Sequence, residues 1–306
     1  MSYLIKIYGT KKILKFFPPV VTGPIIISVG LILAPSAIEN ASTNWFLAIL
    51  ALTIIILCNV FGKGMFKIIP ILLSILITTI LAYFLGQIDL SSVNEANIFG
   101  LPLTSSAFAK FDLSAILTIV PIAIASMMEH IGDIAAVSAT TEKNYFEDPG
   151  LDKTLLGDGI ATSFAGLIGG PANTTYGENT GVLAITKVYN PAILRLAAIF
   201  AIILSVIPKF DAIINAIPIA VIGGISLVLY GMISAIGIRN LVENKIDLSS
   251  SRNLIIVAVI LVTALGFSSI QGITFNLFGI DITLSGLAIA SILGIFLNII
   301  LPPEEN

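Results

Sequence analysis

Residues 16–38 have the sequence FFPPVVTGPIIISVGLILAPSAI, a run of 23 residues without a charged side chain. A helix needs about 20 mainly apolar residues to cross the hydrocarbon core of a bilayer, so this stretch predicts a membrane span. Five more charge-free windows of similar length follow, at residues 40–62, 68–88, 212–238, 253–280 and 282–303. We therefore expect an all-α protein that crosses the membrane several times.

The composition agrees with this class. Of 306 residues, 57% are hydrophobic and 11% are charged, and the mean hydropathy is +1.04, well outside the range of soluble domains. The net charge of −3 and the scattered lysines give no basic surface for nucleic acid. Cys58 is the single cysteine, so no disulfide can form within the chain. We expect the lipid bilayer as a partner, and no cofactor or metal.

The orientation follows from the charges between spans. We predict ten spans or part-spans, at 17–38, 45–61, 68–86, 114–138, 155–170, 177–188, 191–208, 217–237, 253–270 and 282–301. One set of connections carries 13 of the 15 lysines and arginines, and the other carries only Lys110 and Lys209. Cytoplasmic loops are rich in these residues. Both ends of the chain, including the C-terminus, are therefore expected in the cytoplasm, and the loop at 89–110 outside.

The chain contains a candidate internal repeat. Residues 18–25 (PPVVTGPI) align with residues 218–225 (PIAVIGGI) at an offset of 200, and the two spans that they begin run in opposite directions. Secondary transporters are often built from such inverted repeats. The second copy follows 105 residues of its own half, 112–216, whereas 17 precede the first. We expect a fragment of a protein of about 400 residues that lacks four spans. The alternative is a natural short form.

A first cluster of ionisable residues lies within the span at 114–138. Glu129, His130 and Asp133 follow a 16-residue charge-free run, 113–128. Ionisable groups at such depth are costly and are a mark of function. Glu129 and Asp133 are one helical turn apart, so both carboxylates can face one cavity, and two buried like charges favour a shared proton. The alternative is that the helix ends earlier and these residues cap it at the headgroups.

A second cluster has the sequence GGPANTTYGENTG, residues 169–181. Its two glycines and proline end the preceding helix, and the residues that follow favour extended backbone. The apolar run 182–185 is too short to span, so residues 172–188 predict an extended segment and then a half-helix inside the membrane. Free N–H groups at the half-helix start can serve a ligand, and its dipole favours Glu178 as a carboxylate; Glu178 as a plain helix cap is the alternative. Two carboxylates and these donors complement a neutral pyrimidine-dione.

These motifs resemble the nucleobase/ascorbate transporters (nucleobase–cation symporter type 2), and among them the bacterial uracil permeases. The family signature stands complete at 178–187, ENTGVLAITK, with Asn179, Gly181 and Thr186 in its fixed positions. Glu129-His130-Ile131-Gly132-Asp133 is similar to the family's other substrate-helix motif. Asp133 stands where the best-known uracil carrier has histidine, and purine carriers resemble this chain there. Xanthine, uric acid or another nucleobase therefore stays an alternative to uracil.

The resemblance implies a fold of fourteen spans in two inverted repeats of seven, with core and gate domains, of which this chain has about ten spans. Residues 1–16 would then end a preceding span and form a cytoplasmic loop. Residues 17–111 would form the first-repeat gate helices and outer loop, 112–216 the second-repeat core and 217–306 the second-repeat gate. The implied substrate residues are Glu129, Tyr176, Gly177, Glu178 and Tyr230, and Glu129 and Asp133 are the candidates for proton coupling.

The expected activity is import of uracil with protons across the bacterial cell membrane. The exact nucleobase, the coupling ion (proton or sodium) and the oligomeric state, a homodimer included, stay open. An intramembrane enzyme is disfavoured: an aspartyl protease needs Gly-x-Gly-Asp, and the nearest string, Leu155-Leu156-Gly157-Asp158, lacks the first glycine. A zinc protease needs two histidines and the chain has only His130. An anion carrier of the same architecture is disfavoured because Glu129 and Glu178 would repel an anion.

Overall fold

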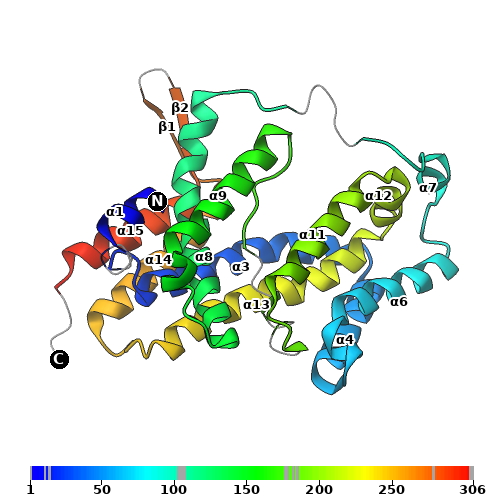
Figure 1. Ribbon diagram of the computed structural model, residues 1–306, viewed down its shortest axis with the longest axis horizontal. Coiled ribbons are helices and arrows are strands. Elements are labelled where there is room, and N and C mark those ends of the chain that lie inside the picture. Colours follow the sequence, from blue (N-terminus) through cyan, green and yellow to red (C-terminus); the bar gives the residue numbers. More distant parts are fainter. Residues whose placement is uncertain are drawn as a thin grey trace. The chain divides into compact units, whose positions relative to one another are not determined.

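The computed structural model describes residues 2–9, 12, 15–101, 108–175, 179–180, 183, 186–277 and 280–302, and it is mainly helical (Figure 1). The chain divides into two compact units. Unit 1 comprises Met1–Ile32, Ala107–Gly181 and Gly231–Asn306, and unit 2 comprises Leu33–Ser106 and Val182–Tyr230. Each unit draws on several of the predicted domains, and the predicted domain boundaries stay a prediction.

Unit 1 contains the residues of the first predicted cluster. Its elements are α1 (Ser2–Tyr8), the beginning of α3 (Pro19–Ser42), α8 (Leu113–Thr141), the π-helix η1 (Phe146–Gly150), α9 (Leu151–Leu167), the end of α13 (Ile219–Glu243), α14 (Ser251–Ser269), β1 (Ile273–Leu277), β2 (Ile280–Leu284) and α15 (Gly286–Ile300). Unit 2 holds the rest of α3, α4 (Trp45–Phe61), α5 (Met65–Ile68), α6 (Pro70–Phe84), α7 (Ser91–Glu95), α11 (Pro191–Ser205), α12 (Pro208–Asn215) and the beginning of α13.

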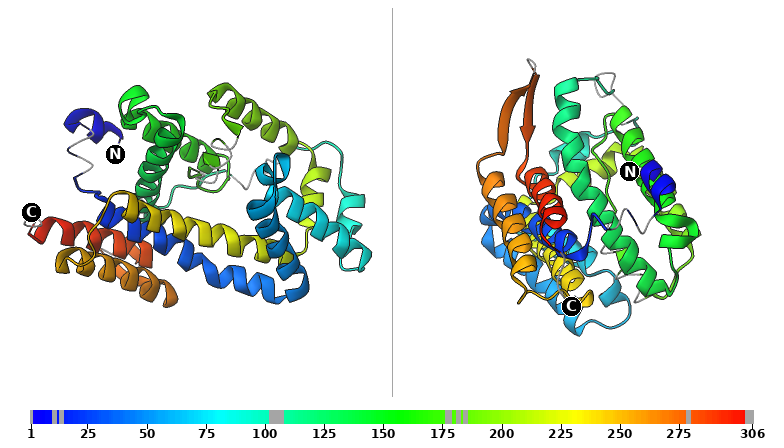
Figure 2. Two further views of the ribbon diagram at one scale, coloured as in Figure 1. Left: turned by 90° about the horizontal axis from the view of Figure 1, so that it is seen from below. Right: turned by 90° about the vertical axis from the view of Figure 1, so that its left-hand side faces the viewer.

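Two apolar cores organise unit 1. In the first, α14 and α15 lie side by side (Figure 2) and pack on the beginning of α3 through Val20, Val21 and Ile25. Gly286 permits this approach, because a Cβ there would lie 2.6 Å from the backbone nitrogen of Ser268. In the second core, Ile131 of α8 packs with Leu151 and Leu155 of α9 and with Ile5 of α1. One face of α8 is therefore fixed against α9.

Unit 2 has a core of its own. Residues 220, 221 and 225 at the beginning of α13 pack with Leu47, Ala51 and Ile55 of α4 and with Ala82 of α6. Gly223 and Gly224 have no room for a side chain, because a Cβ on either would clash with the backbone of Ala41 or Ala48. The glycines of the sequence PIAVIGGI thus let helices approach each other at backbone distance.

The beginnings of α3 and α13 behave alike at the predicted offset of 200. Each helix starts one residue after a proline, at Pro19 and at Ile219, and in each the carbonyl of that proline accepts from the third and fourth backbone N–H groups after it. Residues 20, 21 and 25 enter the core with α14 and α15, and residues 220, 221 and 225 enter the core with α4 and α6. The first copy therefore packs on α14 and α15, which follow α13 in the chain, and the second copy packs on α4 and α6, which follow α3. The inversion of the copies stays a prediction.

Several described helices can cross a membrane. By length and composition these are α3, α13 and α14, and α11 with α12 make a fourth if that pair forms one span. The apolar helices α4, α6 and α15 are shorter. The predicted span 191–208 was too long: α11 ends at Ser205 and the chain bends by 93° into α12. Pro208, the first residue of α12, lacks an N–H and restricts the residue before it, which ends α11 there.

A β-hairpin was not predicted. β1 and β2 pair antiparallel from Ile273 with Leu284 to Leu277 with Ile280, and the hairpin stands beside the first half of α8 (Figure 2). The predicted span 282–301 therefore begins too early, because α15 starts at Gly286, where the side chain of Ser285 accepts from the N–H of Ala288. Ile273 and Phe275 alternate with polar residues, which is a strand pattern, but they lie inside the charge-free window 253–280, which was interpreted as a membrane span.

The predicted extended segment and half-helix at 172–188 are described only in part. Residues 171–175 form no regular element, and Asn179, Thr180, Leu183 and Thr186 are helical. Residues 176–178, 181–182 and 184–185 lie outside the described residues.

Candidate functional site

Helix α8 carries Glu129, His130 and Asp133 well inside its length. It begins after Asp112, whose side chain accepts from the N–H of Ala115, and it ends at Thr141, before Glu142 in a left-handed conformation. The helix thus continues for eight residues beyond Asp133. The alternative in which α8 ends early and these residues cap it is wrong. His130 and Asp133 are buried, with 4% and 5% of their surface exposed, and Glu129 is half-buried.

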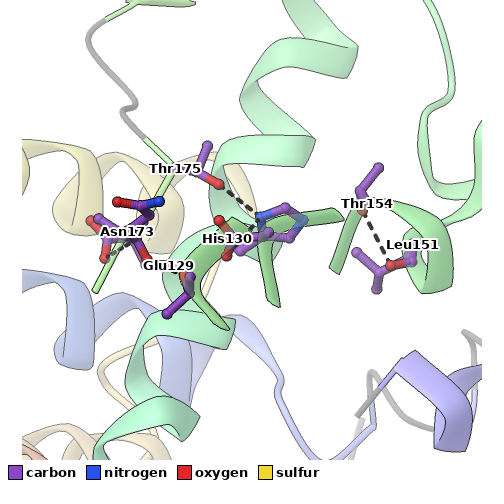
Figure 3. Close-up of polar contacts among 9 residues, drawn as sticks. Glu129, His130, Leu151, Thr154, Asn173 and Thr175 are labelled. Carbon is purple, nitrogen blue, oxygen red and sulfur yellow. Dashed lines mark hydrogen bonds and ion pairs between the residues drawn. The ribbon is translucent and has the colours of Figure 1, made fainter. Parts of the chain in front are cut away.

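The loop after α9 runs past these residues and contacts them in sequence order. The hydroxyl of Thr174 donates to Oε2 of Glu129 at 3.3 Å, and Oγ1 of Thr175 lies 2.7 Å from Nδ1 of His130 (Figure 3). Thr162 of α9 donates to the backbone carbonyl of Asn173 at 3.0 Å. Two adjacent residues of α8 therefore meet two adjacent threonines, and a third contact fixes the loop to α9. Both predicted clusters come together here.

His130 has a second neighbour on α9. Its Nδ1 lies 3.8 Å from Oδ2 of Asp158, which is an ion pair only if the imidazole is protonated. Nε2 of His130 is buried and has no hydrogen-bond partner among the described residues. The imidazole thus presents Nδ1 to polar groups from two segments of the chain.

A small polar cavity lies one residue from Asp133. It has a volume of about 80 Å³ and is lined by Gly132 and Ala135 of α8, Ile26 of α3, and polar residues of α13 that include Asn240. Such a volume is large enough to admit water. Gly132 allows α8 to approach α3 here, because a Cβ would lie 3.3 Å from Ile26.

The profile described as Permease family (Xan_ur_permease) matches residues 1–273, most of the chain. The chain belongs to the Permease family. This permease is similar over its whole length to a probable uracil permease of Pasteurella multocida (strain Pm70): 40% identity over 315 residues, covering 100% of this chain and 73% of the relative. A probable uracil permease of Haemophilus influenzae (strain ATCC 51907 / DSM 11121 / KW20 / Rd) is 40% identical over 318 residues, with 100% and 74% covered. The uracil permease of Bacillus caldolyticus is 36% identical over 315 residues, with 99% and 72% covered.

These relatives fit the bacterial uracil permease branch, so the predicted family is confirmed. Together with the apolar helices, they make this permease a multi-pass protein of the bacterial cell membrane and a transporter rather than an enzyme. The mainly helical fold that the sequence predicted agrees with this class. The number of spans in the whole fold and its inverted repeat stay predictions.

The remaining predicted substrate residues of the permease are placed less fully. Tyr176, Gly177 and Glu178 lie outside the described residues, as does Gly181 of the signature. Asn179 is exposed and Thr186 is half-buried, both in helical conformation. Tyr230 is half-buried in α13 and belongs to unit 2, whereas Glu129 belongs to unit 1.

Sequence reasoning assigned no contact to Thr174, Thr175 or Asp158. The threonines belonged to the motif at 169–181 but were read only as residues that favour extended backbone. Asp158 was considered only as part of a protease motif. No local pattern could give these contacts, because the partners of the threonines are 45 residues away in the sequence.

Proposed function

We propose that this permease imports uracil across the bacterial cell membrane together with protons. The names of its relatives, uracil permeases at 36–40% identity over at least 99% of the chain, support uracil as the substrate. The observation that carries the proposal is the position of the Glu129 carboxylate. It lies within a 29-residue helix and beside the threonines that lead directly to Glu178.

The chemistry of this place suits uracil. Each ring N–H of a neutral pyrimidine-dione is a donor that a carboxylate accepts through a charge-assisted hydrogen bond. The Thr174 hydroxyl donates to Glu129 and so helps to fix the orientation of its carboxylate. The family resemblance also proposes Glu178, Gly177, Tyr176 and Tyr230 as substrate residues, with the Glu178 carboxylate as acceptor for a second ring N–H.

Proton coupling is proposed for Glu129 and Asp133. Both belong to one face of α8, and Asp133 is buried. A proton shared by the pair would lower the cost of moving the site through a low-dielectric region, because a neutral pair needs no counter-ion.

The proposal extends to the whole assembly. It includes fourteen spans in two inverted repeats of seven, core and gate domains, a cytoplasmic C-terminus and a homodimer as the assembly. The equal offset of the α3 and α13 packing positions supports the repeat, since residues 20, 21 and 25 correspond to 220, 221 and 225. The excess of lysine and arginine on one set of loops supports the orientation.

Uptake measurements test the proposal. The protein is expressed from its complete gene in a bacterial strain without a uracil permease, and radiolabelled uracil uptake is measured with and without excess unlabelled xanthine. We expect uptake above the empty-vector control, inhibition by unlabelled uracil but not by xanthine, and collapse of accumulation when a protonophore removes the proton gradient. Uptake of labelled uracil equal to the empty vector would contradict the function, and uptake of labelled xanthine instead would reassign the substrate.

A further inference from the structure

We propose that His130 is a positioning residue whose Nδ1 holds Thr175, and with it the loop 171–175, in place against α8. The inference rests on the proposed function, since it concerns the same site. His130 follows Glu129 directly on α8, and Thr175 directly precedes Tyr176-Gly177-Glu178. The contact between Nδ1 and Oγ1, at 2.7 Å, is therefore one residue away from the proposed substrate residues on both sides (Figure 3).

The contacts of the His130 imidazole show which ring nitrogen holds Thr175. Nδ1 lies 2.7 Å from the Thr175 hydroxyl and 3.8 Å from the Asp158 carboxylate, whereas Nε2 has no hydrogen-bond partner among the described residues. A buried N–H without a partner costs more than a buried lone pair without one. The proton of the neutral ring therefore belongs on Nδ1, where the carboxylate of Asp158 favours it. In this tautomer His130 donates and Thr175 accepts.

This direction has a consequence for the threonine. A hydroxyl can accept and donate at once, so Thr175 keeps its own proton for a further acceptor. Thr174 differs, because its hydroxyl already donates its hydrogen bond to Glu129. Asp158 acts through the imidazole, because its carboxylate lies 3.8 Å from Nδ1 and its charge favours the proton on that nitrogen.

Two amide variants distinguish this role from general packing. The side-chain amide of asparagine reaches about as far as Nδ1 of histidine, and that of glutamine about as far as Nε2. His130→Asn should keep the apparent KM for uracil uptake within about threefold of wild type. His130→Gln should raise it about tenfold, the equivalent of one buried hydrogen bond. The amount of protein in the membrane, measured by immunoblot, should stay the same.

The threonine offers a second test with a smaller change of shape. Thr175→Ser keeps the hydroxyl and should resemble wild type, whereas Thr175→Val should match His130→Gln. The double variant His130→Gln with Thr175→Val should be no worse than either single variant, because both remove one contact. Thr154→Val is the matched control: this threonine donates to the carbonyl of Leu151 within α9 at 3.1 Å, away from the loop (Figure 3). Its KM should not change.

The outcomes separate the two proposals. Uracil uptake by the wild type, with equal effects of His130→Asn and His130→Gln or additive effects in the double variant, would overturn the role of His130 alone. A wild-type protein without uracil uptake would overturn the proposed function and this inference with it. The role of His130 is supported if His130→Asn and Thr175→Ser keep the wild-type KM while His130→Gln and Thr175→Val raise it.

Discussion

Two regions of unit 1 use opposite means to bring segments together. At the proposed site, α8, α9 and the loop 171–175 meet through side-chain hydrogen bonds of Glu129, His130 and Thr162. Where the beginning of α3 meets the end of α13, the backbones themselves touch: a Cβ on Gly237 would lie 2.6 Å from the backbone nitrogen of Ile27 and 2.7 Å from the carbonyl oxygen of Gly23. One contact can break and re-form, and the other leaves no room for change.

The difference divides the tasks between the regions. Hydrogen bonds between side chains contribute about 1 kcal/mol each, so the loop can adjust around a ligand without loss of the fold. An added side chain at a closely packed glycine strains the backbone, because the neighbouring backbone atoms cannot rotate away as a side chain can. We expect substitutions of polar residues at the site to change transport and leave the free energy of unfolding unchanged. Substitutions at the glycine contact should lower the free energy of unfolding and leave uracil binding unchanged.

The largest effect on binding is expected at Glu178, equal to that at Glu129. Glu178→Gln keeps the shape of the side chain but replaces one charged acceptor by a donor, so uracil affinity should fall about 100-fold, the upper range for a charge-assisted hydrogen bond. Competition binding with labelled uracil measures this. Wild-type affinity in the variant would remove Glu178 from the site. Melting temperatures should be alike, as the comparison of the two regions requires.

A smaller effect is expected at Asp133. If it shares a proton with Glu129, Asp133→Asn should weaken proton-driven accumulation about tenfold and weaken uracil binding less. Uptake into membrane vesicles with and without an imposed pH gradient, beside equilibrium binding, gives both quantities. A variant that still concentrates uracil as well as wild type in response to the gradient would exclude Asp133 from coupling.

The smallest effect on binding, and the largest on stability, is expected at Gly237. Gly237→Ala places a methyl group against the backbone of α3 and should lower the free energy of unfolding by about 1–3 kcal/mol. Gly231→Ala is the matched control on α13, because a Cβ there meets nothing within 4 Å in the described structure. Thermal unfolding in detergent compares them. Equal melting temperatures would show that the backbone contact does not carry stability.

Local sequence patterns predicted those features of the structure that depend on a single segment of the chain. The predicted span at 45–61 has the same bounds as α4, and the spacing of Glu129 and Asp133 put both on one helix. The bend after Ser205 was missed, although Pro208 signals it, because hydropathy continues across the break. The contacts of Thr174 and Thr175 could not be predicted, since they depend on how the loop folds back on α8, a property of the tertiary packing.

Equilibrium binding of labelled uracil to the purified protein, wild type against Glu129→Gln, tests the central claim most directly. Glu39→Gln is the control, since Glu39 is an exposed glutamate on another helix, α3. The account predicts saturable binding by the wild type, unchanged binding by the Glu39 variant, and a loss of about 100-fold in affinity for the Glu129 variant, because a charged acceptor is replaced. Wild-type affinity in the Glu129 variant would contradict a substrate site at this carboxylate.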